Sequence, residues 1–351
     1  MYSLILCIFA KKYKMDNIDF VVLWLDSNDP NWQKDYMTYA QKSNFGKESV
    51  RFRDHDIFRY WFRAVETYAP WVHKVFLVTN GKFPDWINKD CPKLELVEHA
   101  DYIPHEYLPT FNSVVIENFL NRINGLSEHF VYFNDDIFLN APVTPTYYFK
   151  KGLPCDNNKE TCFNVPIYTE KDRYGVTLSM LMSIGIINLH FNRWKTVLQS
   201  PTKWFGFHLG LKGLIMSCIL AKQRLFVGFT NFHIEQAFLK SIFDDAWEKE
   251  TDLLNKNCTR FRTDQSISQY IFRYWQFASN KFYPKKRSRA FFFLNNRDVI
   301  KEIENTMTEK KCKSICLNDS VFCSDDDYEY LKVNLPLLFE KKFPQKSSFE
   351  K

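Results

Sequence analysis

The chain has 351 residues, of which 45% are hydrophobic and 25% are charged, the proportions of an ordinary globular protein. Its mean hydropathy is -0.36, and no apolar run approaches the ~20 residues of a membrane-spanning helix, so the composition excludes an integral membrane protein. Lys and Arg number 47 against 41 Asp and Glu, a mild excess that suits an anionic ligand and does not indicate nucleic-acid binding. No glycine-rich phosphate loop occurs, which argues against dinucleotide enzymes, kinases and P-loop ATPases.

The N-terminus and the cysteines bear on where the protein works. In residues 1–14 lysines follow a short apolar run, the reverse of their order in a signal peptide. We expect this segment to be a mis-assigned extension before a true start at Met15, with a weak interfacial membrane anchor as the alternative. The nine cysteines indicate reduced thiols and a cytoplasmic location. Cys312, Cys316 and Cys323 lack the paired spacing of a structural zinc site.

Short apolar runs alternate with helical patterns over residues 18–139. Strands are predicted at 19–25, 75–78, 94–97 and 130–133, and helices at 57–68 and 113–122. This order predicts an α/β fold with an open, mostly parallel sheet that is covered by helices.

The second half has a different character. Residues 140–202 are less regular and predict an insertion or a lid, whereas helical patterns dominate residues 203–351. A strand-like piece at 314–317 and a last helix near 328–341 close the chain. We therefore expect one domain over residues 15–351, with a helical second half packed on the sheet.

Polar side chains follow three of the predicted strands, at the edge where open α/β sheets bind ligands. They are Asp26 and Asp29, then Asn80, and finally Asn134, Asp135 and Asp136. Adjacent carboxylates such as Asp135 and Asp136 can hold Mg²⁺ or Mn²⁺ and leave coordination positions for a diphosphate. The alternative is that these acidic pairs only cap or solvate turns.

Two further residues have a chemical and a structural interpretation. A lone histidine such as His233 is more often a structural hydrogen-bonding group than a catalyst. The guanidinium of Arg262 either binds phosphate oxygens or pairs with Asp264.

Together these motifs resemble the Stealth family of sugar-phosphotransferases. The similar stretches are 18–32 for its first block, 51–136 for the second, 228–262 for the third and 315–350 for the fourth. Two positions depart from the family pattern, because Ser27 replaces the usual Gly and Glu235 replaces a Pro that usually follows the histidine.

The resemblance implies a nucleotide-sugar transferase fold of the GT-A-like type. It implies transfer of a hexose-1-phosphate, in our expectation N-acetylhexosamine-1-phosphate, from a nucleotide-diphospho-sugar such as a UDP-sugar. The acceptor would be a hydroxyl of a capsular or cell-surface polysaccharide, giving a phosphodiester and a nucleoside monophosphate. The alternatives are an ordinary metal-dependent glycosyltransferase and an inactive glycan-binding protein. A peripheral contact with the inner face of the membrane is left open.

The resemblance also assigns roles. Asp135 and Asp136 would hold Mg²⁺ or Mn²⁺, and Arg262 would balance the phosphate charge. One of these aspartates or His233 would take the acceptor proton. The donor-binding residues would be Asp26, Asp29, Arg59, Asn80, Asn112, Ser113, Glu117, Asn134 and Lys281. Three of these have structural alternatives, since Arg59 can pair with Asp56, Ser113 can cap its helix and Asn112 can belong to the preceding turn.

Overall fold

The computed structural model describes residues 17–43, 53–162, 171–263 and 266–351, and only the backbone of 41–43 and 171–176. The expected extension at residues 1–14 and the alternative partner Asp264 of Arg262 lie outside the described residues.

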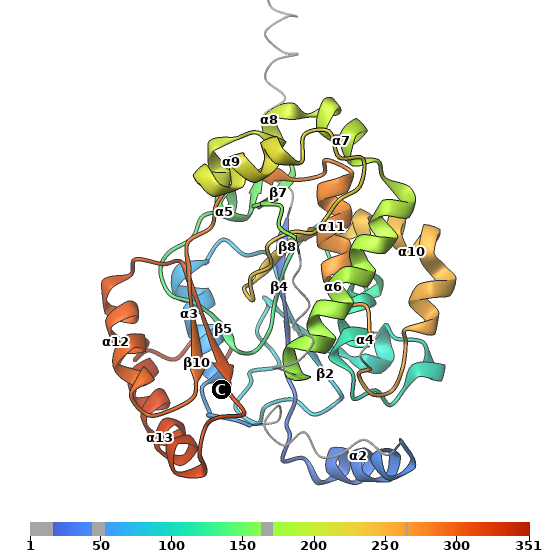
Figure 1. Cartoon of the computed structure of the whole chain (residues 1–351). Coiled ribbons are helices and arrows are strands. Elements are labelled where there is room, and N and C mark those ends of the chain that lie inside the picture. The colour runs from blue at the N-terminus through green and yellow to red at the C-terminus, as the bar shows by residue number, and fades with distance from the viewer. Residues whose placement is uncertain (1–16, 44–52, 163–170, 264–265) are drawn as a thin grey trace, which may run out of the picture.

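The main sheet has five strands in the order β3-β2-β1-β4-β8 (Figure 1). They are β1 (Ile18–Leu23), β2 (Val75–Thr79), β3 (Leu94–Glu98), β4 (His129–Phe133) and β8 (Gln236–Leu239). β1 to β4 pair in parallel, and β8 joins β4 antiparallel. The central strands are apolar on both faces because both faces are covered. The expected α/β fold with a mostly parallel sheet is confirmed.

Two smaller sheets adjoin the main one. The first has the order β10-β11-β5, from β10 (Arg289–Leu294), β11 (Ser314–Asp319) and β5 (Ile137–Leu139). The second comprises β6 (Phe149–Lys150), β7 (Leu153–Asp156) and β9 (Tyr283–Pro284). β5 follows β4 after three residues, so the chain passes directly from the main sheet into the first small sheet.

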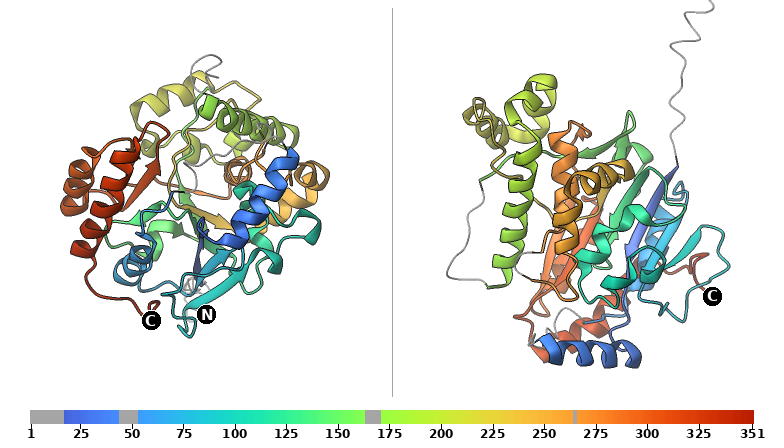
Figure 2. Two further views of the ribbon diagram at one scale, coloured as in Figure 1. Left: turned by 90° about the horizontal axis from the view of Figure 1, so that it is seen from below. Right: turned by 90° about the vertical axis from the view of Figure 1, so that its right-hand side faces the viewer.

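Helices surround these sheets (Figures 1 and 2). The first half contributes α2 (Pro30–Ser43), α3 (Phe58–Tyr68), α4 (Ser113–Asn118) and α5 (Pro145–Tyr148). The middle contributes α6 (Lys171–His190), α7 (Arg193–Gln199), α8 (Pro201–Trp204) and α9 (Gly210–Ile219). The rest are α10 (Lys240–Lys256), α11 (Tyr270–Ala278), α12 (Val299–Glu309) and α13 (Asp325–Lys342). Within the described residues, no helix is both long and apolar enough to cross a bilayer.

The stretch 140–202, which is less regular in sequence, contains the 20-residue helix α6, and α6 packs against α11. Apolar residues lie all around α6 rather than along one face, so its sequence shows no helical period.

The C-terminal block is attached to the core by carboxylates that pair with the buried Arg63. Arg63 of α3 donates from Nε to Glu350 (2.8 Å) and from Nη1 to Glu340 (2.8 Å). Burial would lower the pKa of Arg63, but the hydrogen bonds to Glu350 and the charges of both carboxylates raise it. The last residues of the chain thereby fix the helix that packs on β5.

Candidate active site

The Asn134–Asp136 stretch lies where β4 leaves the main sheet and β5 enters the small one. The backbone N–H of Leu317 in β11 donates to the carbonyl of Asp136 (2.9 Å), which fixes this crossing. His233 precedes β8, whose antiparallel pairing with β4 reaches Tyr132 and Gln236, and its Nε2 lies close to Asn134 and Asp136. Asp136 and His233, which are 97 residues apart in sequence, therefore meet at one edge of the sheet.

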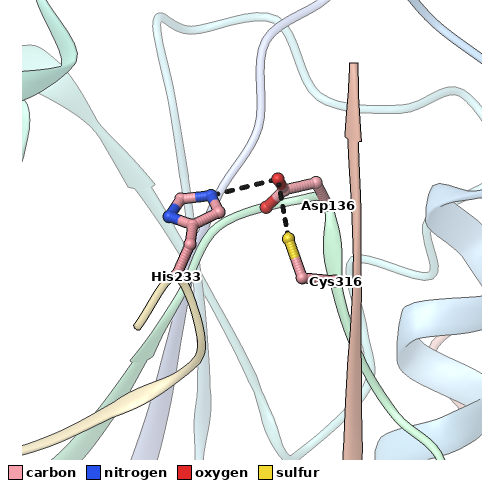
Figure 3. A group of neighbouring side chains, drawn as sticks. All are labelled: Asp136, His233 and Cys316. Carbon is pink, nitrogen blue, oxygen red and sulfur yellow. Dashed lines mark hydrogen bonds and ion pairs between the residues drawn. The ribbon is translucent and has the colours of Figure 1, made fainter. Parts of the chain in front are cut away.

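Asp136 is the centre of a cluster with His233 and Cys316 (Figure 3). His233 Nε2 lies 3.1 Å from Asp136 Oδ2, and Cys316 donates from Sγ to the same oxygen over 3.3 Å. The other carboxylate oxygen, Oδ1, is buried and has no hydrogen-bond partner among the described residues. In this cluster, Oδ2 of Asp136 is already engaged by its neighbours, whereas Oδ1 has no partner and can accept a ligand.

The charges of this cluster shift its titrating groups. Burial lowers the pKa of His233, but the negative charge and hydrogen bond of Asp136 outweigh this and raise it. Burial and Asp136 hold the pKa of the Cys316 thiol well above its usual range, so the thiol keeps its proton. Desolvation, with the charges of Asp136 and Asp54, raises the pKa of Asp135 to about 7, and because Asp135 is exposed to solvent, the charges are the more secure cause.

A second arm of the site starts at the buried Glu117 of α4. The Tyr132 hydroxyl lies 3.0 Å from Glu117 Oε1 and also contacts Asn134 Oδ1, so the two acceptors share its single proton. Asn134 Nδ2 in turn lies 3.4 Å from His233 Nε2. Burial raises the pKa of Glu117, while the positive charge of Arg262 and the Tyr132 hydrogen bond act against that rise.

Arg262 completes this arm from a loop beyond α10. Its Nη2 donates to Ser113 Oγ over 2.5 Å, which places the guanidinium beside the start of α4. The buried Asn112 caps the same helix, accepting from Val114 N (3.2 Å), and donates to the Thr259 carbonyl (3.1 Å). Asn112 thus ties the loop that carries Arg262 to α4, and the cap of the helix is Asn112 rather than Ser113.

Glu235, the second departure from the family pattern, has its own partner. Its side chain is fully buried, and Arg287 donates from Nη2 to its carbonyl (2.5 Å) and lies 3.4 Å from Oε1. Tyr148 donates to the same carboxylate oxygen over 3.4 Å. The backbone two residues after His233 is therefore held by charge-assisted contacts.

The structure brings together seven of the residues that the sequence singled out. They are Ser113, Glu117, Asn134, Asp135, Asp136, His233 and Arg262. Asn112 lies beneath them as a helix cap. Asn80 directly follows β2 and has a buried side-chain oxygen that lacks a partner among the described residues.

The remaining donor-binding predictions have other contacts. Asp26 and Asp29 accept backbone N–H groups two residues ahead of them and so shape the turn into α2. Arg59 lies 3.7 Å from Asp56, which is the structural alternative expected for it. Lys281 is not brought to this group, because it follows the far end of α11, where its charge acts on Lys203.

Tyr132, Cys316 and Phe291 also belong to the site, although the sequence did not single them out for it. Tyr132 lies two positions before Asn134, and strand alternation could have placed both on one face. Cys316 and Phe291 are partners in the pairing of β11 with β10, and the Phe291 ring lies 6.4 Å from the His233 ring. A local sequence pattern does not predict contacts of Cys316 and Phe291 with residues so distant in sequence.

The site fits a divalent cation bound through oxygen. The unpartnered Oδ1 of Asp136 and the adjacent carboxylate of Asp135 are the hard ligands that Mg²⁺ and Mn²⁺ prefer. The protonated thiol of Cys316 is a hydrogen-bond donor to Asp136 rather than a thiolate ligand. Cys312, Cys316 and Cys323 have separate partners and, among the described residues, do not gather into one metal-binding group.

Comparison with known proteins gives consistent matches. Residues 51–156 match the family described as Stealth protein CR2, conserved region 2. The chain is 38% identical over 343 residues to the capsular polysaccharide phosphotransferase WcwK of Streptococcus pneumoniae, covering 96% of this chain and 99% of that relative. It is 37% identical over 337 residues to the exopolysaccharide phosphotransferase cps2G of Lactiplantibacillus plantarum, covering 95% and 96%.

Two more matches extend this set. The receptor polysaccharide phosphotransferase WefC of Streptococcus gordonii is 36% identical over 343 residues, covering 96% of this chain and 99% of that one. Among solved structures, the galactosyltransferase LgtC with donor and acceptor sugar analogs matches with a TM-score of 0.35 and 9% identity, over 92% of this chain and 95% of that one.

Proposed function

Because the chain belongs to the Stealth family of sugar-phosphotransferases, we propose that it transfers a hexose-1-phosphate from a nucleotide-diphospho-sugar to a polysaccharide hydroxyl. The hexose is N-acetylhexosamine, the donor is a UDP-sugar, and the acceptor is a growing capsular or other cell-surface polysaccharide. These nucleotide sugars are made in the cytoplasm, so we place the enzyme there, at the inner face of the membrane. We assign the whole of residues 15–351 to one catalytic domain.

The observation that supports this most is that helix α4 connects Arg262 with the cluster around Asp136. Arg262 bonds to Ser113 of α4, and its positive charge acts on Glu117 of the same helix. From Glu117, close polar contacts run through Tyr132, Asn134 and His233 to Asp136. A cationic group thus lies on one side of α4 and a carboxylate cluster on the other side of these contacts. A diphosphate with its metal ion needs both kinds of group at once.

The proposed reaction is an in-line displacement at the phosphorus next to the sugar. The acceptor oxygen forms a bond to this phosphorus, and the bond from the phosphorus to the bridging oxygen of the diphosphate breaks. The nucleoside monophosphate leaves with that bridging oxygen. Such a transfer depends on positioning, on neutralising the phosphate charge and on a group that takes the acceptor proton.

Residues of this chain can meet each requirement. Arg262, held against Ser113, would balance charge on the phosphate oxygens. Asp135, Asp136 or His233 would take the acceptor proton, since all three lie at the carboxylate end of the site. Asn80, with its unpartnered buried oxygen, remains a candidate for donor binding.

We propose that Asp135 and Asp136 hold the divalent metal. A bound Mg²⁺ or Mn²⁺ would neutralise charge on the diphosphate and on the leaving group. Cys316 and His233 position the Asp136 carboxylate through its other oxygen. Removal of the metal by a chelator should therefore stop transfer, and added Mg²⁺ or Mn²⁺ should restore it.

An exposed aromatic face beside the site suits the acceptor. Phe291 and Phe293 of β10 are exposed and lie edge to face, with ring centroids 4.8 Å apart. In the β10–β11 register Phe291 pairs with Cys316, so it projects toward the same side as the thiol that contacts Asp136. The apolar face of a sugar ring stacked there would bring its hydroxyls toward the carboxylate cluster.

A tracer experiment tests the proposal. The enzyme receives UDP-N-acetylhexosamine labelled at the phosphate next to the sugar, together with Mg²⁺ or Mn²⁺ and a short polysaccharide acceptor. Entry of the label into the acceptor with release of UMP supports phosphate transfer. Transfer of the sugar with the label left in UDP would identify an ordinary glycosyltransferase instead. Glycan binding without turnover of any nucleotide sugar would indicate an inactive binding protein.

A further inference from the structure

One long segment of the chain contains no acidic residue. Between residues 174 and 234 there are six Lys and Arg and no Asp or Glu, whereas the chain as a whole carries a net charge of +6. One of the six, Arg193, is buried and bonds to Glu160 through Nε (2.6 Å) and Nη2 (2.7 Å). Lys195, Lys212, Lys222 and Arg224 are exposed. This segment therefore carries exposed positive charge that no acidic residue of the same segment offsets.

The same segment exposes apolar side chains on helix α9. Leu211, Ile215 and Ile219, spaced four residues apart, are 76%, 52% and 68% exposed. Gly213 and Ser217 are the buried residues of this helix. α9 thus packs on the protein through small side chains and turns its branched side chains outward, the reverse of an ordinary surface helix.

Phe207 extends the apolar stripe. It lies in the short turn Phe207–Leu209 that leads into α9, and it is 97% exposed. We call the exposed Phe207, Leu211, Ile215 and Ile219, with Lys212, Lys222 and Arg224, the cap surface. It belongs to a group of helices, α7 to α9, that lies at the end of the molecule opposite α2 (Figures 1 and 2).

We propose that the cap surface binds an anionic lipid bilayer, with the apolar stripe of α9 among the headgroups and acyl chains. An exposed amphipathic helix with basic residues beside its apolar face lies in the plane of a membrane interface. Lys and Arg near such a surface each add attraction to anionic headgroups. This inference does not depend on which group the enzyme transfers.

The charge distribution favours a bilayer over a second copy of the chain as the occupant. Two copies facing each other through this surface would bring the same uncompensated positive charges together. An anionic bilayer supplies the opposite charge and also covers the apolar stripe.

Vesicle binding tests the proposal on the full chain. Sedimentation is compared with vesicles of phosphatidylcholine alone and of phosphatidylcholine mixed with phosphatidylglycerol. We expect binding to the anionic vesicles, weaker binding as salt is added, and little binding to the neutral ones. The double variant Ile215→Glu/Ile219→Glu should lose at least about tenfold in vesicle affinity, because two charges enter the apolar stripe.

Helix α13 offers a matched control. Val333 and Leu337 are also four residues apart, 62% and 64% exposed, and follow a first turn made of acidic residues. Val333→Glu/Leu337→Glu should leave vesicle binding unchanged. Lys212→Gln should weaken it about fivefold, since each basic residue near the bilayer contributes separately. Circular dichroism checks that every variant folds.

Three results would overturn the proposal. The first is absence of wild-type binding to anionic vesicles. The second is equal loss of binding in the α9 and α13 double variants. The third is a wild-type dimer in light scattering that Ile215→Glu/Ile219→Glu converts to a monomer while vesicle binding persists, since the stripe would then join two copies. The tracer experiment on a soluble acceptor stays informative in each case, because it needs no membrane.

Discussion

The carboxylate site and the cap surface use charge in opposite ways. At the site, Asp136 lies within 3.3 Å of His233 and Cys316, and the guanidinium of Arg262 bonds to Ser113 of helix α4. At the cap surface, exposed lysines stand beside exposed aliphatic side chains with no acidic residue in the same segment. A modest net charge of +6 thus combines two unlike regions: in one the charged groups contact each other, and in the other the basic residues have no acidic residue in their own segment.

Asp136→Asn, at the carboxylate site, should have the largest effect of all the substitutions considered for the two regions. The amide keeps the shape of the side chain and removes the negative charge that we assign to the metal. We expect transfer to fall by at least about 10³-fold, with the fold intact. The labelled-donor assay measures the loss, and circular dichroism with thermal unfolding checks the fold. Substantial remaining turnover would remove Asp136 from the metal site.

Arg193→Ala tests whether Arg193, a buried charge within residues 174–234, contributes to the stability of the fold. The change leaves Glu160 buried without its partner, so the free energy of unfolding should fall by about 3–5 kcal/mol. Urea unfolding measures the effect. Lys195→Ala, two residues away and exposed, is the control and should change stability little. Equal effects of the two variants would contradict the distinction between paired and unpaired charge in this segment.

Arg262→Lys tests the cationic end of the site. A lysine keeps the charge and loses the planar, two-pronged donor geometry, so kcat should fall by about 10²-fold. The neighbouring Arg260 contacts backbone carbonyls of Leu108 and Pro109 and supplies the control, because Arg260→Lys should leave the chemistry nearly unchanged. If both substitutions reduce kcat equally, Arg262 acts by holding its loop and not on phosphate.

Cys316→Ala examines how far the site depends on its positioning contacts. The thiol donates to Oδ2 of Asp136, the oxygen opposite the unpartnered Oδ1, so its loss should loosen the carboxylate. We expect about a tenfold fall in kcat and a higher metal requirement, with partial rescue by Cys316→Ser, which restores a donor. An unchanged metal requirement would assign Cys316 to packing alone.

Local sequence patterns predicted one of the two segments that form the carboxylate site. The run before Asn134 identified a buried strand, and the position of the carboxylates at its end followed from the rule for open sheets. The second segment, which carries His233, could not be predicted in the same way. β8 is a short antiparallel strand, and only its pairing with β4 brings His233 to Asp136. Pairing between distant segments depends on tertiary packing, which a local pattern does not record.

The cap surface shows the opposite limit of sequence patterns. The apolar period of Leu211, Ile215 and Ile219 correctly indicates a helix, and such a stripe ordinarily faces the core. Here it faces outward, because the small residues Gly213 and Ser217 occupy the packed side. The period of apolar residues shows that they lie on one face of a helix. It does not show whether that face points toward the protein core or toward solvent.

The smallest effect is expected for the exposed lysines of the cap surface, and it tests directly how this surface differs from the carboxylate site. Lys212→Gln/Lys222→Gln removes two of the exposed charges of the cap surface, and neither lysine has an ion-pair partner among the described residues. The free energy of unfolding should change by less than about 0.5 kcal/mol, because exposed side chains away from packed features contribute little. The kcat on a soluble acceptor should also stay the same, since both lysines lie outside the carboxylate site. A large loss of stability would mean that these charges are paired within the protein, and the contrast between the two regions would then fail.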